Sequence, residues 1–309
     1  MRAVVITKPG DLDVLEVADR TAREPGAGEV RIAVKAATVN PTDIGLRQRG
    51  GGGDPPWVPG MDAAGVIESL GPDVDRLEVG QEVMAAVSPR RPEGGAQQEL
   101  LVVPAASVVP IPDGVTVAEA ATLPMNGLTA LRGLEMLGLE KGKTLAVTGG
   151  AGLLGSYVIP LAKEQGLRVI ADAKPEDEEL VKSFGADVVV PRGAPFTDAV
   201  REAAPGGADA VYDTALLRRE AFGAIRDGGQ IVVVRGWDGN EAEDRGIRVH
   251  PVMVATALER TEWLEQLREL ASAGKLKLRV AHEYPPEQAA EAQRVMDAGG
   301  LRGRAVIVF

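Results

Sequence analysis

Apolar and polar residues alternate along much of the first third of the chain. In the segment 29–37, Val30, Ile32 and Val34 fall on one face, as in a half-buried β-strand. A helix is expected from Asn40-Pro41 to about Gln48. Further strands, bounded by glycine and proline turns, are predicted at 3–7, 12–17, 64–70, 81–87 and 98–103. Many short strands with such punctuation favour a small, barrel-like β domain.

From Thr144 the pattern changes to strands that alternate with helices. Apolar runs predict strands at 144–148, 167–173, 187–190, 210–213 and 230–234, and helices at 153–165, 177–184, 197–203 and 218–225. This order predicts an α/β fold with a doubly wound parallel sheet. Helices are also expected at 117–123 and 128–137, separated by Pro124. The remaining predictions are a strand at 247–254, a helix at 261–273, a strand at 280–284, a helix at 286–297 and a strand at 305–309.

A glycine-rich turn joins the first strand of the parallel sheet to its helix. Gly150, Gly152 and Gly155 have the spacing G-x-G-x-x-G, which lets the backbone approach a pyrophosphate at the N-terminus of a helix. The frame of strand, helix and strand makes this a dinucleotide signal; the alternative is a helix-capping turn without a ligand. The cofactor-binding residues predicted here are Gly150, Ala151, Gly152, Leu153, Leu154 and Gly155.

Composition narrows the classes of function. The 309 residues carry a net charge of −11, which argues against a nucleic-acid surface. There is no cysteine, so disulfides, a cysteine nucleophile and cysteine-based zinc sites are excluded. The first residues run straight into a strand and no apolar run reaches membrane-spanning length. A cytoplasmic protein that binds neither membrane nor nucleic acid is expected.

An ordered series of short motifs covers nearly the whole chain. The series comprises Asn40-Pro41-Thr42-Asp43, Pro59-Gly60-Met61-Asp62-Ala63-Ala64-Gly65-Val66-Ile67, Gly80-Gln81-Glu82-Val83, Ile111-Pro112-Asp113-Gly114, Gly127-Leu128-Thr129-Ala130, Phe184-Gly185-Ala186-Asp187, Gly228-Gly229-Gln230, Ala273-Gly274-Lys275-Leu276 and Gly303-Arg304-Ala305-Val306. It resembles the medium-chain dehydrogenase/reductase superfamily, and within it the zinc-free, zeta-crystallin-like quinone oxidoreductases. The resemblance implies a GroES-like β-barrel domain over 1–115, a Rossmann domain over 116–255, a return to the first domain over 256–309, and an active cleft between the domains.

The residue types also indicate whether the chain can bind a catalytic zinc ion. Zinc-dependent relatives bind the catalytic metal through cysteine and histidine, and a catalytic site needs about three protein ligands. Here the histidines are His250 and His282, far beyond the β domain, and Met61-Asp62 occupies the position of a ligating His before Glu. No metal is therefore expected.

The resemblance also implies roles for individual residues. Asn40 would lie near the nicotinamide ribose and the substrate, Thr129 would contact the nicotinamide, and Arg304 would bind the cofactor. Independently of the resemblance, Trp57 is the only aromatic residue of the β domain and follows a glycine-rich loop, so it is expected to form a wall of the substrate cleft. The alternatives are an Asn in a turn, a polar helix residue for Thr129, and a Trp that packs on prolines. Asp43 and Arg47 have helical i, i+4 spacing, so a local ion pair is expected between them.

The end of the second parallel strand distinguishes NADP from NAD. NAD-binding proteins place an acid there to bind the ribose hydroxyls. The resemblance puts that position at Ala173, and strand alternation then turns Asp172 away. Lys174 and Arg192 stand near it and favour the 2′-phosphate of NADPH; the alternative is NADH, which a shift of the acidic position by one residue to Asp172 would favour. Thr214, Gly236 and Trp237, which follow the next two strands, are expected on the far side of the cofactor.

The resulting hypothesis is zinc-independent, NADPH-dependent hydride transfer to a quinone or an α,β-unsaturated carbonyl. Residues 1–156 contain no tyrosine, so water is the expected proton source. The alternative is a cofactor-binding redox sensor or crystallin-like protein with little turnover. RNA binding fits poorly with the acidic charge. By analogy with relatives, a homodimer that continues the parallel sheet through 230–234 and 248–254 is expected.

Overall fold

The chain divides into two compact units in the computed structural model, which describes residues 1–193, 195–237 and 245–309. Unit 1 comprises Met1–Met125, Ala255–Gly274 and Leu278–Phe309. Unit 2 comprises Asn126–Val254 and Lys275–Lys277. The segment 116–125, which the resemblance assigned to the second domain, groups with unit 1 because helix α2 (Val117–Ala120) packs on the sheet of that unit.

Unit 1 is built on a seven-stranded sheet whose longest strand is β3. The strands are β3 (Glu29–Val39), β4 (Asp62–Leu70), β5 (Glu82–Ala86), β6 (Leu100–Pro104), β7 (Val108–Pro110), β14 (Val280–Tyr284) and β15 (Arg304–Val308). Their order is β14-β15-β3-β4-β5-β7, and β6 pairs with the first half of β3. Ile32 lies opposite Ile67 and Leu101, and all of these side chains are buried in one apolar cluster. The predicted alternation along β3 therefore forms the core.

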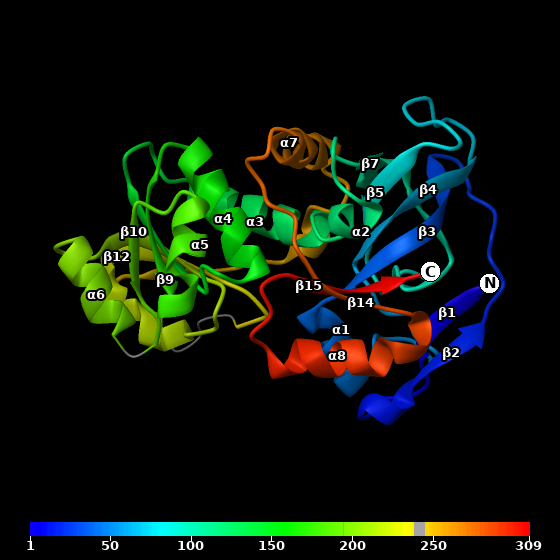
Figure 1. Ribbon diagram of the computed structural model, residues 1–309, viewed down its shortest axis with the longest axis horizontal. Coiled ribbons are helices and arrows are strands. Elements are labelled where there is room, and N and C mark those ends of the chain that lie inside the picture. The colour runs from blue at the N-terminus through cyan, green and yellow to red at the C-terminus, as the bar shows by residue number, and fades with distance from the viewer. Residues whose placement is uncertain (194, 238–244) are drawn as a thin grey trace. The chain divides into compact units, whose positions relative to one another are not determined.

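Two strands and several helices complete unit 1. β1 (Arg2–Ile6) and β2 (Leu15–Asp19) form a separate antiparallel pair. Helix α8 (Ala289–Ala298) packs on β15 and against α1 (Pro41–Arg49), where it is visible in red in Figure 1. Helix α7 (Thr261–Ser272) packs on β7.

Unit 2 is a six-stranded parallel sheet with strand order β10-β9-β8-β11-β12-β13. The strands are β8 (Thr144–Thr148), β9 (Arg168–Ala173), β10 (Val188–Pro191), β11 (Ala208–Asp213), β12 (Ile225–Val233) and β13 (Arg248–Pro251), and the helices are α3 (Pro124–Leu137), α4 (Leu153–Glu164), α5 (Glu178–Ser183) and α6 (Phe196–Ala203). Helices α4 and α5 both pack on β9, in the green part of Figure 1. The order of the strands reverses between β8 and β11, and sheets of this kind bind ligands at that point.

Some local predictions differ from the structure. The helix predicted at 218–225 forms at Arg218–Ala224 as a 3-10 helix, and β12 already starts at Ile225, which pairs with Ala208. The strand predicted at 12–17 begins only at Leu15, after the 3-10 helix Leu12–Val14. β7 was missed because three residues carry no periodic signal. The other 3-10 helices are Ala105–Ser107, Pro175–Asp177, Val254–Thr256 and Pro286–Gln288.

None of the helices in the described residues has both the length and the apolar character needed to cross a membrane.

Candidate functional site

The turn between β8 and α4 is closed too tightly for side chains at two of its glycines. Gly149 has φ +69°, and a Cβ there would lie 2.6 Å from the hydroxyl of Thr214. A Cβ at Gly155 would lie closer than 3.0 Å to the carbonyl oxygen of Gly149, which is backbone and cannot move aside cheaply. Gly149 was not among the predicted residues, although a Gly-Gly pair directly after a strand is a signal for it.

The carboxylate of Asp172 holds this turn in place. Its Oδ1 accepts hydrogen bonds from the backbone N–H of Gly149 at 2.5 Å and of Gly150 at 3.1 Å, and the side chain is buried. Burial raises the pKa of Asp172, while the Gly150 amide and the charge of Arg192 act in the opposite direction. Asp172 is thus engaged by the glycine turn, a role that strand alternation alone did not reveal.

Two cations stand where β9 and β10 end. Ala173 is the last residue of β9 and lies opposite Pro191, the last residue of β10. Lys174 and Arg192 follow directly and are exposed, and the Arg192 N–H donates to the Ala173 carbonyl at 3.0 Å. The Lys174 ammonium lies 3.8 Å from Glu176, and an exposed pair of this kind is weak. This corner of the sheet can therefore bind an anion.

Further predicted residues lie along the same edge of unit 2. The Thr214 hydroxyl donates to the Thr148 carbonyl at 2.5 Å, so Thr214 adjoins the glycine turn. Asp213 fixes the loop that follows β11 by accepting the N–H of Leu217 at 3.0 Å. After β12, Gly236 is exposed with φ +75°.

Trp237 and Thr129 have structural contacts of their own. Trp237 is half-buried and packs on Phe222 with ring centroids 6.1 Å apart, so core packing accounts for at least part of its environment. Thr129 lies on α3 and is buried, and its carbonyl accepts the Tyr212 hydroxyl at 2.6 Å. Burial raises the pKa of Tyr212, which therefore keeps its proton and donates to α3.

In unit 1, Asn40 and Arg304 meet in a buried polar cluster that also contains Thr38, Asp43 and Asp62. The Arg304 Nε donates to the Asn40 Oδ1 at 2.9 Å, although 264 positions separate the two residues in the sequence. The Asn40 Nδ2 donates to the Asp62 Oδ2 at 2.7 Å, and Thr38 donates to the same oxygen at 2.6 Å. Both ends of the Asn40 amide are thereby fixed, and its side chain is fully buried.

The two carboxylates of the cluster also position backbone. The Asp62 Oδ1 accepts the N–H of Met125. Asp43 accepts the N–H of Asn40 at 2.7 Å and of Gly60 at 2.8 Å, so it ties the start of α1 to the strand connection at Gly60. In the sequence, Asp62 stands out only because Met61-Asp62 occupies the position of the ligating His and the following Glu of zinc-dependent relatives. Its role depends on contacts between distant segments, which no local pattern displays.

The expected ion pair between Asp43 and Arg47 is wrong. Asp43 is occupied by backbone N–H groups, and the buried Arg47 instead donates to Gln293 at 2.9 Å and to Asp11 at 3.3 Å. Tertiary partners thus replace the local i, i+4 contact.

Trp57 lies apart from this cluster. Its indole N–H donates to the Gly52 carbonyl at 3.2 Å, and its ring packs against Ile6 and Leu46. A Cβ at Gly50 would lie 2.9 Å from the ring, so the glycine run is packed against Trp57.

The buried carboxyls make stability depend on pH. Burial raises the pKa of Asp43 to about 7 and that of Asp62 to about 6, from 3.8. The folded state then holds these protons more tightly than the unfolded chain. Their contribution to stability is complete below pH 3.8 and is lost as the pH rises through about 6 to 7.

We therefore expect the free energy of unfolding to fall by about 1–2 kcal/mol more in the unchanged protein than in Asp43→Asn between pH 6 and 8.5, measured by urea titration. The exposed Glu82→Gln variant should behave like the unchanged protein. Equal pH dependence of all three proteins would refute this assignment.

Metal ligands are not gathered at either site: within the described parts of the chain, no group of three or more His, Cys, Asp or Glu side chains could hold an ion.

Two known protein families match parts of this chain. Residues 26–113 match the family described as alcohol dehydrogenase GroES-like domain, and residues 184–307 match the family described as zinc-binding dehydrogenase. A 2-methylene-furan-3-one reductase from Solanum lycopersicum is 32% identical over 99% of this chain and 79% of its own. The NADPH-dependent alkenal/one oxidoreductase of Arabidopsis thaliana chloroplasts has the same identity and coverage.

A solved structure is also similar to this chain over its whole length. The quinone oxidoreductase from Coxiella burnetii is 25% identical, superposes with a TM-score of 0.86, and is matched over 99% of its chain and 100% of this one. The expected α/β fold, with a GroES-like domain and a Rossmann domain, is confirmed. The chain belongs to the medium-chain dehydrogenase/reductase superfamily, in its quinone oxidoreductase family.

Proposed function

We propose that the protein is an NADPH-dependent oxidoreductase that transfers hydride to a quinone or an α,β-unsaturated carbonyl. The observation that carries the proposal is the glycine turn held by Asp172, with Lys174 and Arg192 at the adjoining strand ends. The relatives named above are reductases of conjugated carbonyl compounds or quinones, and one is named for NADPH. This chemistry needs an acceptor whose conjugation spreads the incoming charge onto oxygen.

The residues of unit 2 fit the cofactor. The first turn of α4 presents N–H groups, and the turn from Gly150 to Gly155 lets a pyrophosphate approach them, because side chains are excluded at its tightest points. Lys174 and Arg192 would bind the 2′-phosphate. Thr214, Gly236 and Trp237 would line the rest of the nucleotide site. When bound, the reduced nicotinamide supplies the hydride.

In unit 1, Arg304 and Asn40 form a rigid pair whose orientation is set by Asp62, and both would contact the cofactor. Thr129, on α3, would contact the nicotinamide. Residues 1–156 offer no tyrosine as an acid, so water would deliver the proton that completes the product.

We also propose that the reaction proceeds without zinc. The chain has no cysteine, and its two histidines lie elsewhere: His250 shares a hydrogen bond with Gln230 at 2.8 Å, and His282 lies on β14. At the position where zinc relatives carry a ligating His, this chain has Met61, whose thioether is a poor zinc ligand.

The affinities for NADPH and NADH test directly whether Lys174 and Arg192 bind the 2′-phosphate. The double change Lys174→Gln and Arg192→Gln should raise the Kd for NADPH by at least about tenfold, since two charge-assisted contacts are lost, and leave the Kd for NADH nearly unchanged. Fluorescence titration with both nucleotides measures this. Lys182→Gln, on α5 and paired with Glu178 and Glu179, is the control. Equal losses for the two nucleotides would contradict the assignment.

The reaction itself is tested by following NADPH absorbance with a panel of quinones and enones. Oxidation that saturates with the acceptor is the expected result. Saturable NADPH binding with no acceptor-dependent oxidation would indicate the sensor or crystallin-like alternative instead.

We propose a homodimer formed through β13, the edge strand of unit 2. Within the described residues, β13 pairs only with β12, so its other edge is open to a second copy. Light scattering after size exclusion would give the mass of two chains, and a mass of one chain would contradict this arrangement.

A further inference from the structure

A pocket of about 480 Å³ lies beside Trp57, entirely within unit 1. It is lined by the glycine run 51–53, by Pro56 and Trp57, and by Arg20, Arg90 and Arg91. This volume lies in the range of small-molecule sites. Neither Asn40 nor Asp62 lines it, so this Trp57 pocket is separate from the buried polar cluster.

The charge of the Trp57 pocket is opposite to that of the chain. The protein carries −11 overall, yet the residues that line this pocket include three arginines and a single acidic residue, Asp54. A concave surface lined by one sign of charge concentrates ions of the other sign. The pocket therefore favours an anion although the molecule as a whole repels one.

The arginines of the pocket differ in their partners. Arg91 lies 3.1 Å from Glu29 and 3.6 Å from Glu93, so its charge is already compensated. Arg20 and Arg90 have no ion pair within the residues that the structure describes, and Arg90 is exposed.

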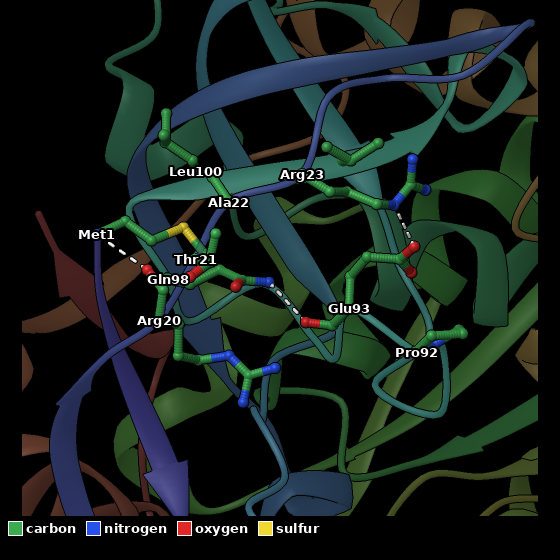
Figure 2. Close-up of a pocket in the computed structure, with 10 residues that line it drawn as sticks. Met1, Arg20, Thr21, Ala22, Arg23, Pro92, Glu93, Gln98 and Leu100 are labelled. Carbon is green, nitrogen blue, oxygen red and sulfur yellow. Dashed lines mark hydrogen bonds and ion pairs between the residues drawn. The ribbon is translucent and has the colours of Figure 1, made fainter.

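Figure 2 shows the adjoining pocket, of about 220 Å³, which shares Arg20 and Pro92 with the Trp57 pocket. There Arg23 is joined to Glu93 at 2.5 Å, as the dashed line shows, whereas the Arg20 guanidinium has no ion pair with any residue that the structure describes. The pairs of Arg23 and Arg91 hold the loop 88–94 in place and leave Arg20 and Arg90 available to a ligand.

Trp57 contributes apolar surface to the lining of this pocket. It is the one aromatic residue in positions 1–156, it is half-buried, and its indole N–H is fixed by Gly52. Glycine at positions 50 and 51 lets the backbone lie against the ring, since a Cβ at either position would approach the indole to 2.9–3.2 Å. Conjugated rings stack on indole, and guanidinium planes stack on such rings as well.

We propose that the Trp57 pocket binds a small conjugated anion, with its ring against Trp57 and its negative group paired with Arg20 and Arg90. The site lies in unit 1 alone and does not rest on the proposed hydride transfer. A carboxylate or sulfonate on a planar, unsaturated ring system has the required chemistry.

A matched pair of probes tests the proposal on the full-length protein without nucleotide. Naphthalene-2-sulfonate and the neutral naphthalene-2-sulfonamide have the same ring and nearly the same shape, so isothermal titration of each isolates the effect of charge. We expect saturable binding of the sulfonate, about tenfold tighter than the sulfonamide and weakened by salt. Equal affinities, or no saturable binding of the sulfonate, would overturn the proposal.

Variants then locate the site. Arg20→Gln with Arg90→Gln should reduce the affinity for the sulfonate to that for the sulfonamide, and Asp54→Asn should increase it. The arginine variant loses no ion pair of the described chain, so it is expected to fold; its melting temperature checks this. Arg219→Gln, exposed in unit 2, is the control and should change neither affinity. A preference for the sulfonate that survives the double change would refute the assignment of the two arginines.

Trp57→Leu should weaken both probes alike by about tenfold, because it removes the stacking wall and no charge. Unchanged affinity of both probes in a folded Trp57→Leu protein would show that the ring does not bind there.

Discussion

Replacing Gly155 with alanine is expected to lower the free energy of unfolding by about 3 kcal/mol, at the upper end of the usual cost of overpacking. The added Cβ would meet the carbonyl oxygen of Gly149, and neither the turn nor the helix can yield without breaking the bonds of Gly149 and Gly150 to Asp172. Because those bonds shape the proposed pyrophosphate site, the Kd for NADPH should also rise by at least about tenfold.

Ser156→Ala is the matched control for this variant. Ser156 is the next residue on α4, equally buried, and the change removes only the hydrogen bond of its hydroxyl to the Leu153 carbonyl at 2.8 Å. Its cost should stay near 1 kcal/mol with unchanged NADPH affinity. Urea titration and fluorescence titration measure the two quantities. A Gly155→Ala protein as stable as Ser156→Ala, with unchanged NADPH affinity, would contradict the tight-turn assignment.

The second large effect is expected at Asp62. Asp62→Ala removes the acceptor of Thr38, Asn40 and the Met125 N–H, all of them buried, and it also removes a carboxylate whose charge acts on Arg304. Breaking one partner out of a buried charged network typically costs about 3–5 kcal/mol. We expect a loss of about 3 kcal/mol in urea titration at pH 8, where Asp62 is ionised.

Asp62→Asn should be intermediate, because its amide oxygen keeps one acceptor while its N–H₂ faces other donors. Asp19→Asn, an exposed change on β2, should stay within about 0.5 kcal/mol of the unchanged protein. If both Asp62 variants were as stable as Asp19→Asn, the buried polar cluster would not be a stabilising network.

Local pattern was sufficient to predict most of the elements and the glycine turn. The alternation of Val30, Ile32 and Val34 and the apolar run 144–148 are signals that a single segment carries, and both strands formed as expected. The binding of the turn by Asp172 could not be deduced, because it depends on how β9 lies beside β8.

The candidate site could be predicted only in part, because its residues meet through contacts between distant segments of the chain. Arg304 and Asn40 were both singled out, but only as residues implied by the resemblance, and their direct bond joins β15 to the start of α1. Arg47 shows the opposite case. Its expected local partner was Asp43, but it donates to Gln293 and Asp11, which lie in distant segments of the sequence. Sequence spacing identifies neighbours on one helix but not which neighbour is closer after folding.

The central claim is hydride transfer from NADPH to a conjugated acceptor without a metal. It is tested most directly by measuring acceptor-dependent NADPH oxidation after exhaustive chelation of the purified protein. Undiminished, saturable oxidation of NADPH by a quinone or enone is the predicted result. Loss of activity on chelation with recovery on zinc addition, or no binding of NADPH at millimolar concentration, would contradict it.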